Sequence, residues 1–122
     1  MEKANLNYTY ILNHFVVNSI FTRKQTLIIY NKILKEKRGD NVSAGSYYRQ
    51  LVQCRAKARK VVWAILLLRL LNAVNNDIFS ILNQLNDQLS VISNKPNDEV
   101  DDELLNNVIS LVDDVIKRLV LI

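Results

Sequence analysis

The chain has 122 residues, of which 49% are hydrophobic, and its 16 basic and 12 acidic side chains give a formal net charge of +4. This length fits one domain, and the apolar content is typical of a globular protein. Two glycines and one proline are too few for the turns of an all-β fold, so we expect an all-α fold. One histidine and one cysteine exclude a His/Cys metal cage, a Cys–His nucleophile pair and an internal disulfide within a single chain.

The sequence shows neither a targeting segment nor a membrane span. Asparagines and His14 interrupt any apolar stretch in the first 20 residues, which argues against a signal peptide. The most apolar run, 61–71, contains Arg69 and is far shorter than the roughly 20 residues that cross a bilayer. We therefore expect a soluble, cytoplasmic protein, and the lone thiol fits a reducing compartment.

Charge is distributed unevenly along the chain. Residues 21–60 hold 11 basic and two acidic side chains, a net charge of +9, whereas residues 61–122 hold four basic and nine acidic side chains, a net charge of −5. Such a split indicates one surface for a polyanion and another for a different role, the alternative being that the charges simply solvate helix faces. We expect a single domain over 1–122, with a basic helical head (1–60) and an apolar, acidic part (61–122).

Apolar periodicity predicts about five helices in chain order. The first covers 6–20. The second begins at Thr22, where the sequence of 22–25 is typical of a capping box, and ends near Gly39. The third runs from 44 to about 72 with Ser43 as its N-cap, and a bend near Lys60 is compatible with its length. Its second half is apolar nearly all round, so we expect that half to be buried on several sides, by the rest of the domain or by a partner subunit.

Two further helices are expected in the acidic part. The fourth covers 75–92, and the last carries an apolar stripe up to Leu119. Carboxylates between Asp98 and Glu103 are expected at the N-terminus of the last helix, where they favour the positive end of its dipole. The stripes of these two helices and the run 61–71 are more apolar surface than a small monomer hides easily. We therefore predict a homodimer built by the C-terminal half, the alternative being that these helices fold back on the basic head and complete the core within one chain.

The first half of the third helix has a polar stripe next to an apolar one. At 100° per residue, six polar side chains share an arc of about 100° around the helix. These are Ser46, Arg49, Gln50, Gln53, Lys57 and Lys60. Tyr47, Leu51 and Cys54 turn toward a core. Arg and Gln can bond bases in the major groove and Lys can neutralise phosphate, while Arg55 and Arg59 could hold the backbone on either side.

These residues resemble a known pattern. Residues 22–25, followed by 43–60, are similar to the helix-turn-helix of sigma-factor region 4, in which a Thr-capped helix precedes a recognition helix ending in a basic run. The Asn-, Ile- and Lys-rich character also resembles small archaeal or viral regulators. The resemblance covers about a third of the chain and implies that Ser46, Tyr47, Arg49 and Gln50 face bases, and that Arg55, Lys57, Arg59 and Lys60 face the backbone. The chain departs from the family because the segment before Ser43 has no room for a separate scaffold helix, so the helix from Thr22 would serve instead.

The sequence thus predicts a DNA-binding protein, a transcription regulator or genome-organising factor that acts by occupying double-stranded DNA. The candidate DNA-binding residues are Arg23, Lys24, Ser43, Ser46, Arg49, Gln50, Gln53, Arg55, Lys57, Arg59 and Lys60. The alternative is a non-enzymatic helical assembly or adaptor protein whose basic stripe binds an acidic protein.

Other function classes have less support in the sequence. No residue pattern activates a nucleophile or pairs a general acid with a base, so we expect no enzyme, and also no cofactor, metal or small-molecule ligand. Peripheral membrane binding needs an exposed apolar face beside the basic residues. We expect that face to be committed to the core, and hence no membrane partner.

Overall fold

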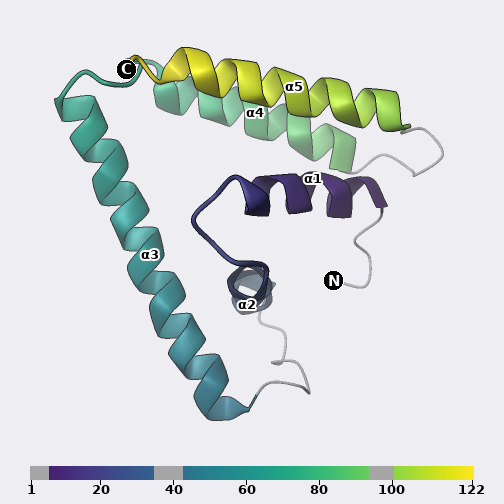
Figure 1. Ribbon diagram of the computed structural model, residues 1–122, viewed down its shortest axis with the longest axis vertical. Coiled ribbons are helices and arrows are strands. Elements are labelled where there is room, and N and C mark those ends of the chain that lie inside the picture. The colour runs from purple at the N-terminus through teal and green to yellow at the C-terminus, as the bar shows by residue number, and fades with distance from the viewer. Residues whose placement is uncertain (1–5, 35–42, 94–100) are drawn as a thin grey trace. The chain divides into compact units, whose positions relative to one another are not determined.

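The computed structural model describes residues 6–34, 43–93 and 101–122, which form five α-helices (Figure 1). They are α1 (Leu6–Val17), α2 (Arg23–Leu34), α3 (Ala44–Leu70), α4 (Ile78–Ser93) and α5 (Asp102–Leu119). Among these described residues the only β-type pairing is an isolated bridge between Val74 and Val120. The predicted all-α fold with about five helices is confirmed. The third helix continues without a break past Lys60.

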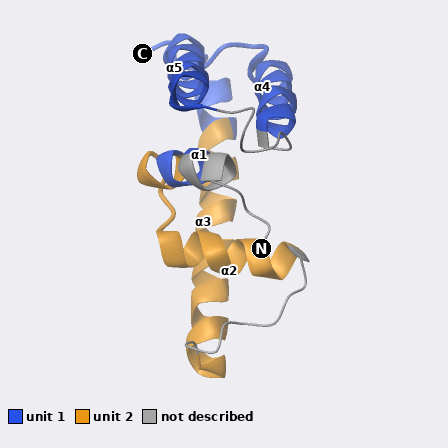
Figure 2. Cartoon of the chain, turned by 90° about the vertical axis from the view of Figure 1, so that its right-hand side faces the viewer, with its two compact units in different colours: residues 1–14, 66–122 blue, residues 15–65 orange. Residues whose placement is uncertain are grey.

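The chain divides into two compact units (Figure 2). Unit 1 comprises Met1–His14 and Leu66–Ile122, and unit 2 comprises Phe15–Ile65. The boundary lies inside α3, five residues beyond the expected division at 60/61. Because residues 61–65 carry no charge, the uneven charge of the sequence maps onto the units, with +9 in unit 2 and −5 in unit 1.

The core of unit 2 is formed where α2 crosses the first half of α3. Figures 1 and 2 show that the two helices cross rather than run side by side. Ile28 of α2 and Leu51 and Cys54 of α3 are buried, and Ile29 and Tyr47 pack against them. The placement of Tyr47 in this core confirms the interpretation of that residue as a packed side chain. It also corrects the base-facing position that the sigma-factor resemblance implied for it.

Both predicted N-caps of unit 2 are present. The Thr22 amide donates to Gln25 Oε1 and the Gln25 amide donates to Thr22 Oγ1, each over 3.1 Å, which is a reciprocal capping box. At the start of α3, the Ser46 amide donates to Ser43 Oγ over 3.1 Å. Each bond satisfies an amide that has no partner within its helix.

In unit 1 a defined motif ends α3. The Asn72 amide donates to the Arg69 carbonyl over 3.1 Å and the Ala73 amide donates to the Leu68 carbonyl over 2.8 Å. Asn72 adopts φ 57°, the left-handed conformation that asparagine tolerates better than most residues. Together these features form a Schellman motif, which stops the helix and turns the chain toward α4.

Unit 1 continues as a pair of neighbouring helices. The Asn75 amide donates to the Leu119 carbonyl and the Leu121 amide donates to the Ala73 carbonyl, so the chain before α4 is paired with the chain after α5. Val74, Ile78 and Leu119 are buried beside this pairing. As the sequence predicts, carboxylates begin α5: Asp101 caps it by accepting from the Leu104 amide over 2.9 Å, and Asp102 and Glu103 fill the first turn. The positions predicted at 98 and 99 lie outside the described residues.

Candidate nucleic-acid interface

The described part of unit 2, residues 15–34 and 43–65, contains basic side chains and no carboxylate. Its cations are Arg23, Lys24, Lys32, Arg49, Arg55, Lys57, Arg59 and Lys60, and all except Lys57 are exposed. With no acidic side chain among these residues, the positive potentials of the cations add instead of cancelling. This surface suits a polyanion.

The exposed face of α3 lies away from α2, and it differs from the predicted stripe. Ser46 and Gln50 are only half-exposed, because the side of α3 that packs on α2 extends to them. Arg49, Gln53 and Lys60 are exposed and lie on one edge of the free face, separated from its other edge by roughly 100° around the helix. That other edge carries Arg55 and Arg59, also exposed.

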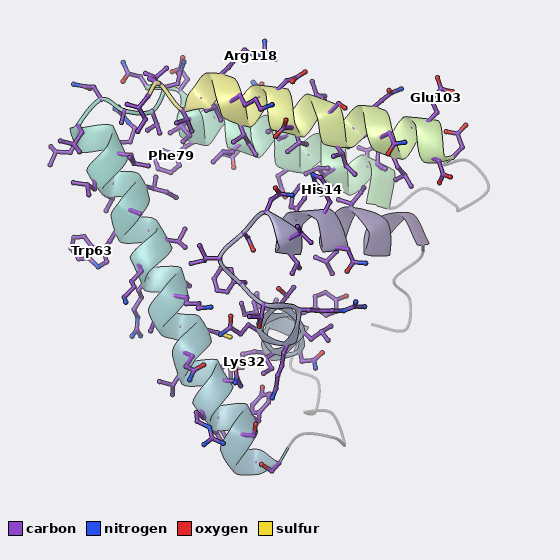
Figure 3. The ribbon with its side chains drawn as sticks, in the orientation of Figure 1. His14, Lys32, Trp63, Phe79, Glu103 and Arg118 are labelled. Atoms are coloured by element: carbon purple, nitrogen blue, oxygen red, sulfur yellow. The ribbon has the colours of Figure 1, made fainter. Side chains whose placement is uncertain are left out.

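Apolar side chains, which the sequence did not predict, cross the free face from one basic edge toward the other: at 100° per residue Tyr48 lies on the edge of Arg55 and Arg59, whereas Val52 and Ala56 lie between the two edges. Tyr48 and Val52 are 64% and 63% exposed, and Ala56 continues their line at the same four-residue spacing. Trp63, 72% exposed, projects from the same side of α3 farther along the helix (Figure 3). The signal was present in the sequence, because residues spaced by four share a helix face.

The exposed line corrects one expectation from the sequence. The apolar face beside the basic residues was expected to be committed to the core, and this is wrong for Tyr48, Val52 and Trp63. In the second half of α3, Leu66 and Leu70 are more than half exposed, so the rest of the chain does not bury them, and their burial by a partner subunit stays a prediction. No helix in the described ranges is long and apolar enough to cross a membrane.

Lys57 has a structural contact that the sequence analysis did not foresee. Its Nζ donates to Gln25 Oε1 over 2.8 Å and to the Ile20 carbonyl over 3.0 Å. Two of its three N–H donors are thereby used within unit 2, and the side chain is half-buried instead of pointing freely to solvent. Lys57 makes these contacts because helical rotation places it beside Gln50, on the side of α3 that faces α2.

The Lys57 contact belongs to a small network at the start of α2. Gln25 is only 5% exposed, and its Oε1 accepts from both Lys57 and the Thr22 amide. Cys54 Sγ lies 3.7 Å from the Gln25 carbonyl and donates to it. Burial raises the pKa of the Cys54 thiol, and the nearby positive charge of Lys57 opposes this rise. The thiol is therefore neutral at ordinary pH and acts as a packed group rather than a nucleophile.

The remaining candidate residues lie at the ends of helices. Arg23 and Lys24 are exposed in the first turn of α2, and Ser43 is exposed directly before α3. The structure thus brings the candidate residues together in unit 2, with Ser46, Gln50 and Lys57 turned toward α2 and the others toward solvent. In the part of the chain that the structure describes, no three His, Cys, Asp or Glu side chains are grouped to hold a metal ion.

Unit 1 has an apolar groove of about 380 Å³ between α4 and α5. The groove is lined by Leu85, Gln88, Leu89, Val91, Ile92, Val108, Leu111 and Val112. Val91 and Leu111 are exposed at its rim, whereas Val112 is buried at its floor. Its lining carries no charge, in contrast to the basic face of α3.

Comparison with protein-family models, curated proteins and solved structures gives no match to this chain. The resemblance to sigma-factor region 4 therefore stays a prediction.

Proposed function

We propose that this chain binds double-stranded DNA through the exposed face of α3 and acts by occupancy, as a transcription regulator or genome-organising factor. The observation that carries the proposal is the charge of unit 2, whose described residues include eight cations and no carboxylate. Neutralising phosphates releases condensed counterions, which supplies most of the affinity of non-specific DNA binding.

The arrangement of the cations on α3 supports a groove-bound helix. The major groove of B-DNA is about 12 Å wide and an α-helix with its side chains is about 10–12 Å across. A helix lying in the groove faces a phosphate backbone on each side. Arg55 and Arg59 on one edge, and Arg49 and Lys60 on the other, match that geometry, with Arg23 and Lys24 of α2 as further phosphate contacts.

A homodimer formed through unit 1 completes the proposal. The apolar groove between α4 and α5, with Val91 and Leu111 exposed at its rim, supports a self-complementary contact between two copies. A twofold dimer would present two copies of unit 2 to DNA, as helix-turn-helix dimers do at paired half-sites.

Fluorescence anisotropy of a labelled 24-base-pair duplex of mixed sequence, measured at several salt concentrations, tests DNA binding. The wild type should bind with a steep salt dependence, and the Arg55→Gln/Arg59→Gln variant should bind more weakly. The slope of log K against log salt should decrease by about 0.9 for each phosphate that the variant no longer neutralises.

The matched control changes two exposed cations of α5, as Lys117→Gln/Arg118→Gln; Arg118 is labelled in Figure 3. If this control weakens binding as much as the α3 variant, the assignment of the interface to unit 2 is wrong.

Competition separates DNA from the other polyanions that this surface could bind. The competitors are an acidic protein, as the assembly or adaptor alternative requires, and vesicles of an anionic phospholipid. Duplex DNA should remain bound when either competitor is present at equal charge concentration. Displacement by the acidic protein would favour the adaptor function, and displacement by vesicles would favour a membrane surface.

A further inference from the structure

The face of α3 that points away from the unit 2 core has an apolar centre. Tyr48, Val52 and Ala56 follow one another at four-residue spacing, and each is exposed. At 1.5 Å per residue the line is about 12 Å long, which corresponds to three or four base-pair steps of 3.4 Å. The line crosses the free face obliquely, from Tyr48 on the edge of Arg55 and Arg59 to Ala56 beside Arg49, so on a helix bound in the major groove Val52 at its middle faces the base edges while the basic edges face phosphates.

Tyr48 is held in place despite its exposure. Its ring meets the ring of Tyr47 edge to face, with centroids 5.5 Å apart and an interplanar angle of 80°. Tyr47 in turn packs against the buried residues of α2 and α3. The position of the exposed ring is therefore coupled to the core of unit 2, so binding through this ring costs less side-chain entropy.

The chemistry of this line selects one feature of the major groove. Valine and alanine offer only methyl groups, and the only apolar group that a base pair presents there is the 5-methyl of thymine. We propose that Tyr48, Val52 and Ala56 contact thymine 5-methyl groups in the major groove and give the chain a preference for thymine-containing duplex. This inference rests on the proposed function and adds residues and a base preference to it.

Charge complementarity favours DNA over a lipid surface for this line. Cations flank Val52 and Ala56 on both sides, Arg55 and Arg59 on one and Arg49 and Lys60 on the other, which matches two phosphate backbones flanking a groove. Between these cations lie Val52 and a small residue, Ala56, and the exposed Trp63 on the same side of α3 lies beyond the last of them, Lys60. A helix that lies in a membrane interface instead needs a broad apolar face.

Replacing thymine by deoxyuridine removes the 5-methyl group and leaves the Watson–Crick hydrogen bonds unchanged. The probe is a mixed-sequence 24-base-pair duplex, made once with thymine and once with deoxyuridine in both strands. Burial of one methyl group contributes about 0.8 kcal/mol, or roughly fourfold in affinity. The wild type should therefore bind the deoxyuridine duplex about fourfold more weakly.

Val52→Ser tests the assigned residues, and Val62→Ser is its matched control. Val62 is a valine of the same helix that is 57% exposed, and the helix propensities of serine and valine are similar. Val52→Ser should reduce the thymine preference to twofold or less, whereas Val62→Ser should keep the wild-type ratio. Helical circular dichroism of both variants checks that unit 2 remains folded.

The outcomes separate this inference from the proposed function. Failure to bind either duplex would overturn both. Binding of the two duplexes with equal affinity would overturn the thymine contact and leave DNA binding in place. A thymine preference that Val52→Ser leaves unchanged would overturn the assignment to this face of α3.

Discussion

Replacing Gln25 by alanine should destabilise unit 2 strongly for a polar substitution. The side chain of Gln25 is buried and accepts from the Lys57 ammonium over 2.8 Å and from the Thr22 amide over 3.1 Å. A hydrogen bond to a charged group contributes about 1.5–3 kcal/mol and a neutral one about 0.5–1.5 kcal/mol, whereas the Thr22 hydroxyl still caps the backbone amide of residue 25 in the variant. The two effects share one oxygen atom, so we expect a decrease in the free energy of unfolding of about 2–4 kcal/mol.

Lys57→Ala should cost less, about 1–2 kcal/mol, because the Thr22 amide still bonds Gln25 and solvent reaches the Ile20 carbonyl. The double variant should cost less than the sum of the single variants, because both substitutions remove the same bond.

Cys54 supplies an assay that is specific to unit 2. It is the single cysteine of the chain and is 2% exposed, so a thiol reagent reacts with it only when unit 2 opens. The ratio of its labelling rate to that of an unfolded reference peptide gives the free energy of opening. Gln53→Ala and Lys60→Ala are the matched controls, because both side chains are exposed on α3 and should change stability by less than about 0.5 kcal/mol. If Gln25→Ala opens no more readily than Gln53→Ala, the network does not stabilise unit 2.

Three further predictions concern Cys54, Gly45 and the groove of unit 1. Burial raises the pKa of the Cys54 thiol, so the contribution of this group to stability is present below the usual thiol pKa of about 8.5 and is lost as pH rises through the pKa of the folded state. The urea midpoint of unfolding should therefore fall at alkaline pH, and it should fall less in Cys54→Ala than in the wild type. Equal falls in the two proteins would contradict this. Gly45 lies in the first turn of α3 with open space where a Cβ would be, so Gly45→Ala should raise stability by about 0.4–1 kcal/mol, seen as a higher melting temperature, and a lower one would contradict the open space at this position. Leu111→Glu at the rim of the groove should give a folded monomer in sedimentation equilibrium, whereas Val112→Glu at its floor should unfold unit 1. A wild-type mass near 14 kDa at every concentration would exclude the dimer.

Local sequence signals predicted the fold well. The capping box at Thr22 and Gln25 and the cap at Ser43 are short-range hydrogen bonds between residues three apart, so the sequence alone determines them. Apolar periodicity located five helices and placed Tyr47 and Cys54 in a core, because side chains on one stripe of a helix are buried together.

The candidate site was harder to predict, because helical rotation tells which side chains share a face but not how far a neighbouring helix covers it. The contact with α2 extends over the side of α3 that holds Gln50 and Lys57, and this shifts the free face toward Tyr48 and Val52. The Lys57–Gln25 bond joins residues 32 positions apart, a distance at which no local rule applies. In the sequence, a lysine on a polar stripe is compatible both with a solvated cation and with a cation bonded to a neighbouring helix. Only the packing of α2 on α3 distinguishes these two roles.

The position of the unit boundary inside α3 limits how this chain can be cut, recombined or lengthened. Backbone hydrogen bonds between residues four apart continue across Ile65 and Leu66, so a fragment that ends there has a helix terminus with four unpaired carbonyls and no Schellman motif. Insertion of a single codon at the boundary would rotate all later residues of α3 by about 100° relative to the earlier ones. The two units are thus joined through a continuous helix, so they cannot be separated by a cut in a loop at this boundary.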